Sequence, residues 1–227
     1  MSRILAIDTA TEACSAALLI EGDVKESFIV APREHNERIL PMVDELLAAA
    51  GLGIQQLDAI AFGRGPGAFT GVRVAAGIVQ GLAYAADLPV IGISNLAALA
   101  YYVFRVYQHE KVFTAIDARM DEIYFAAYKV SAEGQQTLLI PEAVVSPEDA
   151  TGYQDQDMTG WVGVGTGWRY SQRIPFTPNV IYEDILPHAQ DIALLGEQAW
   201  IQGEVMSPEQ AIPVYLRDNV AKKKQER

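Results

Sequence analysis

The pattern of apolar and polar positions divides the first half of the chain into short strands and longer helices. Strands are expected where runs of four to eight apolar or β-branched residues are bounded by turn residues, and helices where apolar residues recur with a period of 3.6. The elements predicted in this way are strands over 3–9, 13–20 and 24–30, a helix over about 35–50 ending at Gly51, a strand over 57–62, a helix over about 70–86, a strand over 89–93 and a helix from Ser94 or Asn95 to about Tyr107. The predicted order is therefore β-β-β-α-β-α-β-α.

The second half repeats this pattern in shortened form. The stretch 112–117 has the same strand-then-aspartate pattern as 5–8, and Ala126-Ala127 follows Ala16-Ala17 at an offset of 109 to 110 residues. The remaining predicted elements are strands over 122–129 and 138–145, a short helix from Ser146, strands over 161–164 and 179–182, and a long helix over 187–202. We therefore predict two lobes, 1–107 and a reduced 108–227, with the last long helix able to pack back on the first lobe.

A glycine-rich loop, Gly63-Arg-Gly-Pro-Gly-Ala-Phe-Thr-Gly71, joins a predicted strand to a predicted helix. Such a junction gathers unpaired backbone N–H groups and the positive end of a helix dipole, which favours phosphate binding. Thr70 could cap the helix through its hydroxyl. The spacing matches neither common phosphate-loop motif. A phosphate cradle containing Gly63, Gly65 and Gly67, and a rigid turn for close backbone packing, are both consistent with it.

The helix after this loop has little charge. Between Val72 and Ala86 its only charged residue is Arg73, while Gly77, Gly81 and Ala85 form a stripe of small residues. Glycine inside a helix costs about 1 kcal/mol relative to alanine, so close approach of another backbone is the expected compensation. That backbone could belong to a partner or to the chain's own sheet.

The helix predicted over 35–50 is apolar over roughly half its circumference, wider than the ~100° stripe that one core needs. We interpret the excess as a surface for a partner, the alternative being that the whole arc is buried within one domain. Together with the following helix, it gives these candidate interface residues: Ile39, Met42, Val43, Leu46, Arg73, Val74, Gly77, Ile78 and Gly81.

Composition narrows the classes of function. The 227 residues are 50% apolar and carry a net charge of −12. Because binding of a nucleic acid backbone depends on Lys and Arg, this charge argues against a chain that holds a nucleic acid by itself. Cys14 is the single cysteine and is expected to be a small core residue. Without a basic-then-apolar leader or a membrane-spanning stretch we expect a cytoplasmic protein, and we expect Lys222-Lys-Lys224 to be a solvated tail.

Two predicted strands, one in each half, end in an aspartate: Asp8-Thr9-Ala10-Thr11 and Asp117-Ala118-Arg119. Carboxylates at equivalent strand ends can converge on one cleft and hold an Mg²⁺–phosphate group, although each could instead cap its own turn. The duplicated α/β arrangement resembles the actin-like, sugar-kinase and Hsp70 ATPase-type fold. Candidate residues for ATP or ADP with Mg²⁺ are Asp8, Thr9, Thr11, Gly63, Gly65, Gly67 and Asp117.

Four segments carry a closer resemblance. They are His35-Asn-Glu-Arg-Ile-Leu-Pro-Met42, residues 63–73, Ile116-Asp-Ala-Arg-Met-Asp-Glu122 and Pro213-Val-Tyr-Leu-Arg217, and together they resemble the bacterial TsaB (YeaZ) family. The resemblance implies a non-catalytic subunit for threonylcarbamoyl transfer to adenosine 37 of tRNAs that decode ANN codons. It implies a heterodimer with a TsaD-type catalytic subunit, a TsaE-type ATPase partner, a homodimer when alone, and contact with tRNA only through the complex.

The catalytic relative carries a metal-binding His-x-x-x-His pair after the fifth strand. The matching positions here are Leu96 and Ala100, and aliphatic side chains cannot hold a metal. The resemblance therefore implies neither a metal site nor a catalytic residue in this chain.

The alternative is a stand-alone small-molecule kinase or ATPase, which Asp8, Asp117 and the glycine loops would support. The absence of a Lys, Glu or His beside Asp117 and the small second half weigh against it.

Overall fold

The computed structural model describes residues 2–151 and 158–217, so Lys222–Lys224 lie outside the described part of the chain. The strands are β1 Arg3–Asp8, β2 Ala13–Ile20, β3 Asp23–Val30, β4 Ala59–Gly65, β5 Val90–Ser94, β6 Lys111–Arg119, β7 Glu122–Val130, β8 Gln136–Val145, β9 Trp161–Val164 and β10 Val180–Tyr182. The α-helices are α1 His35–Ala50, α2 Phe69–Ala86, α3 Asn95–Tyr107 and α4 Ala189–Gln202. Short 3₁₀ turns lie at Ile54–Gln56, Pro147–Asp149, Thr166–Tyr170 and Pro208–Gln210.

The two five-stranded sheets have the same topology. Their strand orders are β3-β2-β1-β4-β5 and β10-β9-β6-β7-β8. In each, the first three strands of the lobe pair antiparallel and the last two join in parallel. This repetition confirms the predicted duplicated α/β fold. In the second lobe the 3₁₀ turn Thr166–Tyr170, which the sequence pattern did not predict, stands between β9 and β10.

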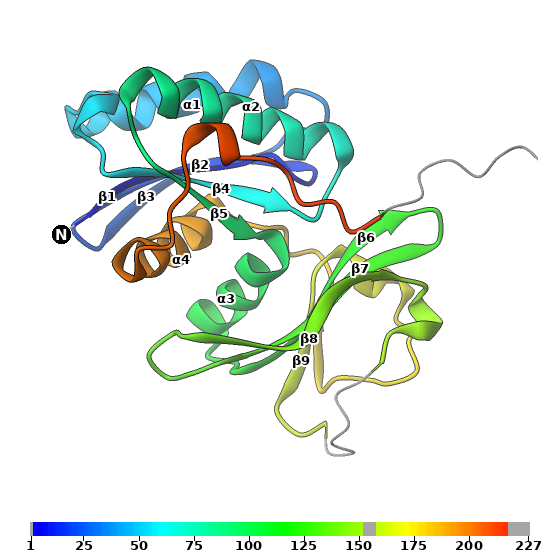
Figure 1. The fold of residues 1–227 in the computed structure, drawn as a ribbon. Coiled ribbons are helices and arrows are strands. Elements are labelled where there is room, and N and C mark those ends of the chain that lie inside the picture. The colour runs from blue at the N-terminus through cyan, green and yellow to red at the C-terminus, as the bar shows by residue number, and fades with distance from the viewer. Residues whose placement is uncertain (1, 152–157, 218–227) are drawn as a thin grey trace, which may run out of the picture.

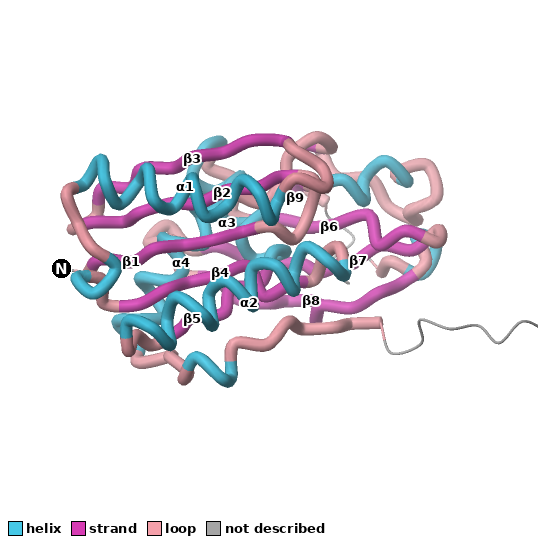
Figure 2. The backbone as a smooth tube through the Cα atoms, turned by 90° about the horizontal axis from the view of Figure 1, so that it is seen from above, coloured by secondary structure: helices cyan, strands magenta, loops and turns pink. Residues whose placement is uncertain are grey.

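Helices cover both faces of the first sheet (Figure 1). Figure 2 shows α1 and α2 lying over its strands, and α4 packs on the opposite face, where Ile192, Ala193 and Leu195 join a core with Ile4 and Ala6. Although α4 follows the second sheet in sequence, it belongs to the core of the first lobe. Helix α3 packs against the second sheet, with Leu96, Leu99 and Val103 in the same core as β6 and β9.

The glycine loop differs from its prediction at both ends. Strand β4 runs on through Gly63 to Gly65, because both glycines still pair with β5 across a shift in register. Helix α2 then begins at Phe69 with Ala68 as its N-cap and without a side-chain cap. The prediction that Thr70 caps this helix is wrong, since Thr70 already lies inside the first turn.

Candidate functional site

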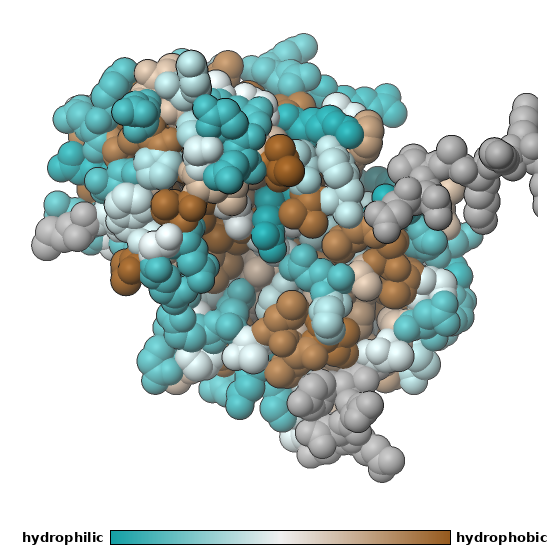
Figure 3. Space-filling view, viewed as in Figure 1, coloured by the Kyte–Doolittle hydropathy of each residue, from teal (hydrophilic) through white to brown (hydrophobic). Residues whose placement is uncertain are grey.

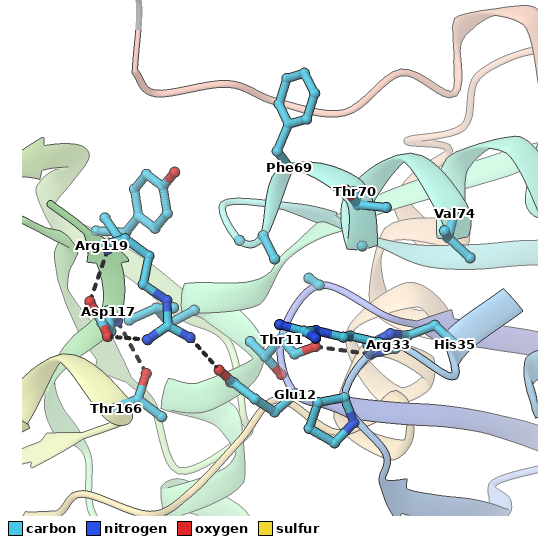
Figure 4. A pocket seen from close by; sticks show the side chains of 18 of the residues that line it. Thr11, Glu12, Arg33, His35, Phe69, Thr70, Val74, Asp117, Arg119 and Thr166 are labelled. Carbon is cyan, nitrogen blue, oxygen red and sulfur yellow. Dashed lines mark hydrogen bonds and ion pairs between the residues drawn. The ribbon is translucent and has the colours of Figure 1, made fainter. Parts of the chain in front are cut away.

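A cavity of about 660 Å³ lies between the two lobes at the end of β1 and the start of α2 (Figure 4). Figure 4 shows Thr11, Glu12, Arg33 and His35 on the first-lobe side, facing Asp117, Arg119 and Thr166 of the second lobe, with the start of α2 above them. A cleft therefore lies between the two lobes, and of the two strand-end aspartates Asp117 lines it.

Asp8 does not line this cavity. It is fully buried, its Oδ1 accepts a hydrogen bond from Asn95 Nδ2 at 2.6 Å, and its Oδ2 has no partner among the described residues. A Cβ at Gly63 would overlap Asp8 Oδ1, so the glycine is needed for close packing of β4 on β1. Burial raises the pKa of Asp8 to about 6.

The backbone groups near Asp8 also form hydrogen bonds within the chain. Gly65 N donates to Asn95 Oδ1 at 2.9 Å, and the buried Thr9 hydroxyl donates to Gly71 O at 2.7 Å. Four of the seven predicted nucleotide residues, Asp8, Thr9, Gly63 and Gly65, therefore lie behind the wall of the cleft. Apart from Asp8 Oδ2, the side-chain and loop hydrogen bonds described here are made within the chain. Asn95, which joins Asp8 to the loop, was missed because it reads as the first residue of a helix.

Thr11, Gly67 and Asp117 do line the cavity. Ala68 N donates to Ala10 O at 2.7 Å, and a Cβ at Gly67 would overlap the same carbonyl. The glycine loop is thus fastened to the end of β1, as the rigid-turn alternative expects.

Asp117 is held by cationic neighbours. Its Oδ2 accepts from Arg119 Nη1 at 2.9 Å and lies 3.5 Å from Arg169 Nη1. Arg119 Nη2 also reaches Glu12 Oε1 at 2.7 Å, which joins the two lobes across the cleft. With Arg33 and Arg217 at the wall, the cavity presents more guanidinium groups than carboxylates. Such a donor set suits an anionic group better than a divalent cation.

The histidines do not gather into a metal site. His35 Nε2 lies 3.0 Å from Thr11 O, His109 Nε2 lies 3.0 Å from the Tyr182 hydroxyl, and His188 Nδ1 lies 2.9 Å from Glu26 Oε2. Within residues 2–151 and 158–217 there is no group of three or more His, Cys, Asp or Glu side chains placed to hold a metal. Nor does any helix in those ranges have the length and apolar character needed to cross a bilayer.

The prediction that α1 contributes residues to an interface with a partner is wrong for the residues named. Ile39, Met42, Val43 and Leu46 are all buried in one core with β1, β2 and α2. The apolar arc is wide because α1 packs on the sheet and beside α2 at once, so two contacts within the chain cover it. Leu40, 43% exposed, is the large apolar side chain that α1 presents to solvent.

Helix α2, in contrast, has an open face. Arg73, Gly77 and Gly81 are exposed, and a Cβ at either glycine would meet no atom within 4 Å. Val74 and Ile78 are half-buried beside them. The small-residue stripe therefore does not pack on the chain's own sheet.

Aromatic residues that the sequence reasoning missed extend this face. The Arg73 guanidinium lies 3.2 Å from the centre of the Phe69 ring and 4.9 Å from that of Tyr215. Phe69 is 60% exposed, and Tyr84 near the other end of the helix is 74% exposed. Phe69 belongs to the glycine loop and Tyr215 to the 213–217 segment, so both lay in motifs already identified. We call Phe69, Arg73, Gly77, Gly81 and Tyr84 the α2 face.

Comparisons with known proteins agree with this architecture. The family model for TsaD, tRNA N6-adenosine threonylcarbamoyltransferase, matches residues 29–225. The tRNA threonylcarbamoyladenosine biosynthesis protein TsaB of Escherichia coli is 45% identical, over 98% of this chain and 97% of that protein. Its Haemophilus influenzae counterpart is 49% identical, over 97% and 96%.

The solved structure of YeaZ from Pseudomonas aeruginosa superposes with a TM-score of 0.91 at 50% identity, covering 95% of this chain and all (100%) of that one. A second Pseudomonas aeruginosa structure, described as an uncharacterized protein with similarity to peptidase YeaZ, gives the same TM-score of 0.91 over 96% of this chain. Identity over nearly the full length, the same duplicated fold and the matched segments lead to one conclusion: the chain belongs to the TsaB (YeaZ) family.

Proposed function

We propose that this chain is a non-catalytic subunit in threonylcarbamoyladenosine biosynthesis, and that it acts by docking its α2 face on a TsaD-type catalytic subunit. Alone, it would pair with a second copy through the same face. Membership of the TsaB family supports the pathway, and the match of the TsaD model over residues 29–225 supports a partner of related fold.

The observation that carries the docking proposal is the exposure of Gly77 and Gly81 on a helix that is otherwise well packed. Two exposed glycines weaken the isolated helix by about 1 kcal/mol each relative to alanine. Close approach of a partner helix, with the backbones in near contact, would offset that cost. Phe69 and Tyr84 would supply apolar area at the two ends of the contact.

The chain offers little of its own for the chemistry. Leu96 and Ala100, at the positions of the relative's histidine pair, are fully buried in α3. The net charge of −12 opposes unaided binding of tRNA, so we propose that tRNA is held by the assembled complex, in the cytoplasm, with a TsaE-type ATPase as a further partner.

We also propose that the interlobe cleft can bind a nucleotide through its phosphates. Arg33, Arg119 and the start of α2 could contact the phosphates of ATP or ADP with bound Mg²⁺. The alternative function, a stand-alone kinase or ATPase, rests on this cavity. The burial of Asp8 and the arginines on Asp117 oppose it, because Asp8 lies outside the lining of the cleft and Asp117 is already ion-paired.

Reconstitution tests this proposal. We expect the purified chain alone to give neither threonylcarbamoyl transfer to tRNA nor phosphate release from ATP, and to be required when added to TsaD-type and TsaE-type subunits. Robust turnover by the chain alone would refute the non-catalytic assignment. Full activity of the other subunits without it would refute the role in the complex.

A further inference from the structure

A second cavity, of about 650 Å³, opens between the lobes and shares no lining residue with the cleft described above. Its walls come from β4 and β5, from β7 and β8, and from α4. Leu216 of the C-terminal segment also lines it. In Figure 3, which has the view of Figure 1, apolar side chains gather over β8 beside polar ones on this face.

Arg64 brings an unpaired positive charge to this cavity. Its Nε is buried and has no hydrogen-bond partner, and its side chain forms no ion pair with any residue in the described ranges. The side chain crosses Gly92, where a Cβ would lie 3.3 Å from Arg64 Cδ. A guanidinium that lines a cavity without an ion pair is a suitable partner for a carboxylate or another anionic group from outside the chain.

A carboxylate with spare capacity lines the same cavity. The Tyr128 hydroxyl donates to Glu142 Oε1 at 2.6 Å, and Tyr128 itself is buried. Burial raises the pKa of Tyr128 well above its usual range, so the hydroxyl stays a donor and fixes Glu142 as acceptor. No ion pair to Glu142 occurs among the residues that the structure describes.

Arg64 and Glu142 carry opposite charges and line the same cavity. Arg64 lies on β4 and Glu142 on β8, and no direct ion pair forms between them within the described residues. Opposite charges that line one cavity at a separation beyond direct contact are complementary to a ligand that carries both charges on neighbouring atoms.

We propose that this cavity binds a free α-amino acid, with its carboxylate on the Arg64 guanidinium and its ammonium group on the Glu142 carboxylate. Gln136 and Gln198 line the remaining wall, where they face the ligand's side chain together with Leu138 and Leu195. This small-molecule site goes beyond the proposed docking function and does not depend on it.

Calorimetry of the full chain with a panel of L-amino acids tests the proposal, with the amino acid amides and N-acetyl amino acids as matched ligands that lack one charge. We expect at least one amino acid to bind, and its amide and N-acetyl forms to bind at least about tenfold more weakly. Arg64→Gln and Glu142→Gln should each weaken binding by a similar factor. Arg173→Gln, which removes an exposed arginine paired with Glu148, should leave it unchanged.

Two results would overturn the proposal. One is the absence of binding by every amino acid in the panel. The other is binding that the amide or the N-acetyl form matches, or that Arg64→Gln and Glu142→Gln leave intact, since the site would then not use these charges. Because the two variants alter different elements, misfolding of one, seen as a lost melting transition, still leaves the other as a test.

Discussion

At the scale of single residues, Asp8 shows how a position that reads as a ligand can become structural. From the sequence, the aspartate at the end of β1 could either hold an Mg²⁺–phosphate group or cap its own turn, and in the structure Asn95 and Gly63 close around it. The sequence marks the strand end and the glycine, but it does not reveal that the glycine makes room for the carboxylate. Only the packing of β4 on β1 shows that Asp8 faces inward.

The buried carboxyl predicts a pH dependence of stability. Burial raises the pKa of Asp8 from 3.8 to about 6, so the folded state holds this proton more tightly than the unfolded state. The stabilisation is complete below pH 3.8 and is lost as the pH rises through about 6, by about 3 kcal/mol for a shift of this size.

Asp8→Asn cannot ionise and keeps an acceptor for Asn95 Nδ2. We therefore expect the free energy of unfolding, measured by urea denaturation, to fall less between about pH 4 and about pH 7.5 in this variant than in the wild type. Asp44→Asn, on the exposed face of α1, provides the control and should follow the wild type. An equal loss in Asp8→Asn and wild type would show that Asp8 is not the group responsible.

At the scale of elements, α1 and α2 show what periodicity can and cannot predict. The bounds of α1 were predicted correctly, because its apolar period and Gly51 both define the helix. What covers its apolar arc was not predicted correctly. A helix that packs on both a sheet and a second helix needs a wider apolar arc than a helix that packs on a sheet alone. For α2 the sparse charge and the glycines predicted an unusual surface, and the structure leaves both glycines open.

The open space at Gly77 gives a prediction about α2. Gly77→Ala should stabilise the free chain by about 1 kcal/mol in thermal or urea unfolding, because alanine favours the helix and its Cβ meets no atom of the chain. It should also weaken association with the partner, where backbones approach closely.

Gly196→Ala in α4 is the matched control, since its Cβ would lie 3.0 Å from Ala61 Cβ in the core. That variant should lose stability. A Gly77→Ala chain that is destabilised, or that binds its partner more tightly, would contradict the open-face description of α2.

At the scale of the whole molecule, two lobes of one topology are joined by contacts that the sequence could not locate. Helix α4 returns to the first sheet, and Arg119 reaches Glu12 across the cleft. The duplication was predictable because the strand-then-aspartate pattern recurs. The ion pairs of Asp117 in the cleft were not predictable from the sequence. They form only because the fold places β6 next to the turn after β9, which brings Arg119 and Arg169 to Asp117.

The α2 face carries the central claim, so a charge placed there tests it most directly. Gly81→Glu adds a carboxylate at an exposed position with free space, so the free chain should fold with an unchanged circular dichroism spectrum. An unpaired charge buried in an interface costs several kcal/mol, and about 3 kcal/mol corresponds to about a hundredfold in affinity.

The measurement is the dissociation constant for the TsaD-type subunit, by calorimetry, with self-association followed by sedimentation. We expect Gly81→Glu to weaken both by about a hundredfold or more. Ala132→Glu, an exposed alanine in the second lobe, should bind as the wild type does. If Gly81→Glu folds and binds the TsaD-type subunit with wild-type affinity, the α2 face is not the docking surface and the account is wrong.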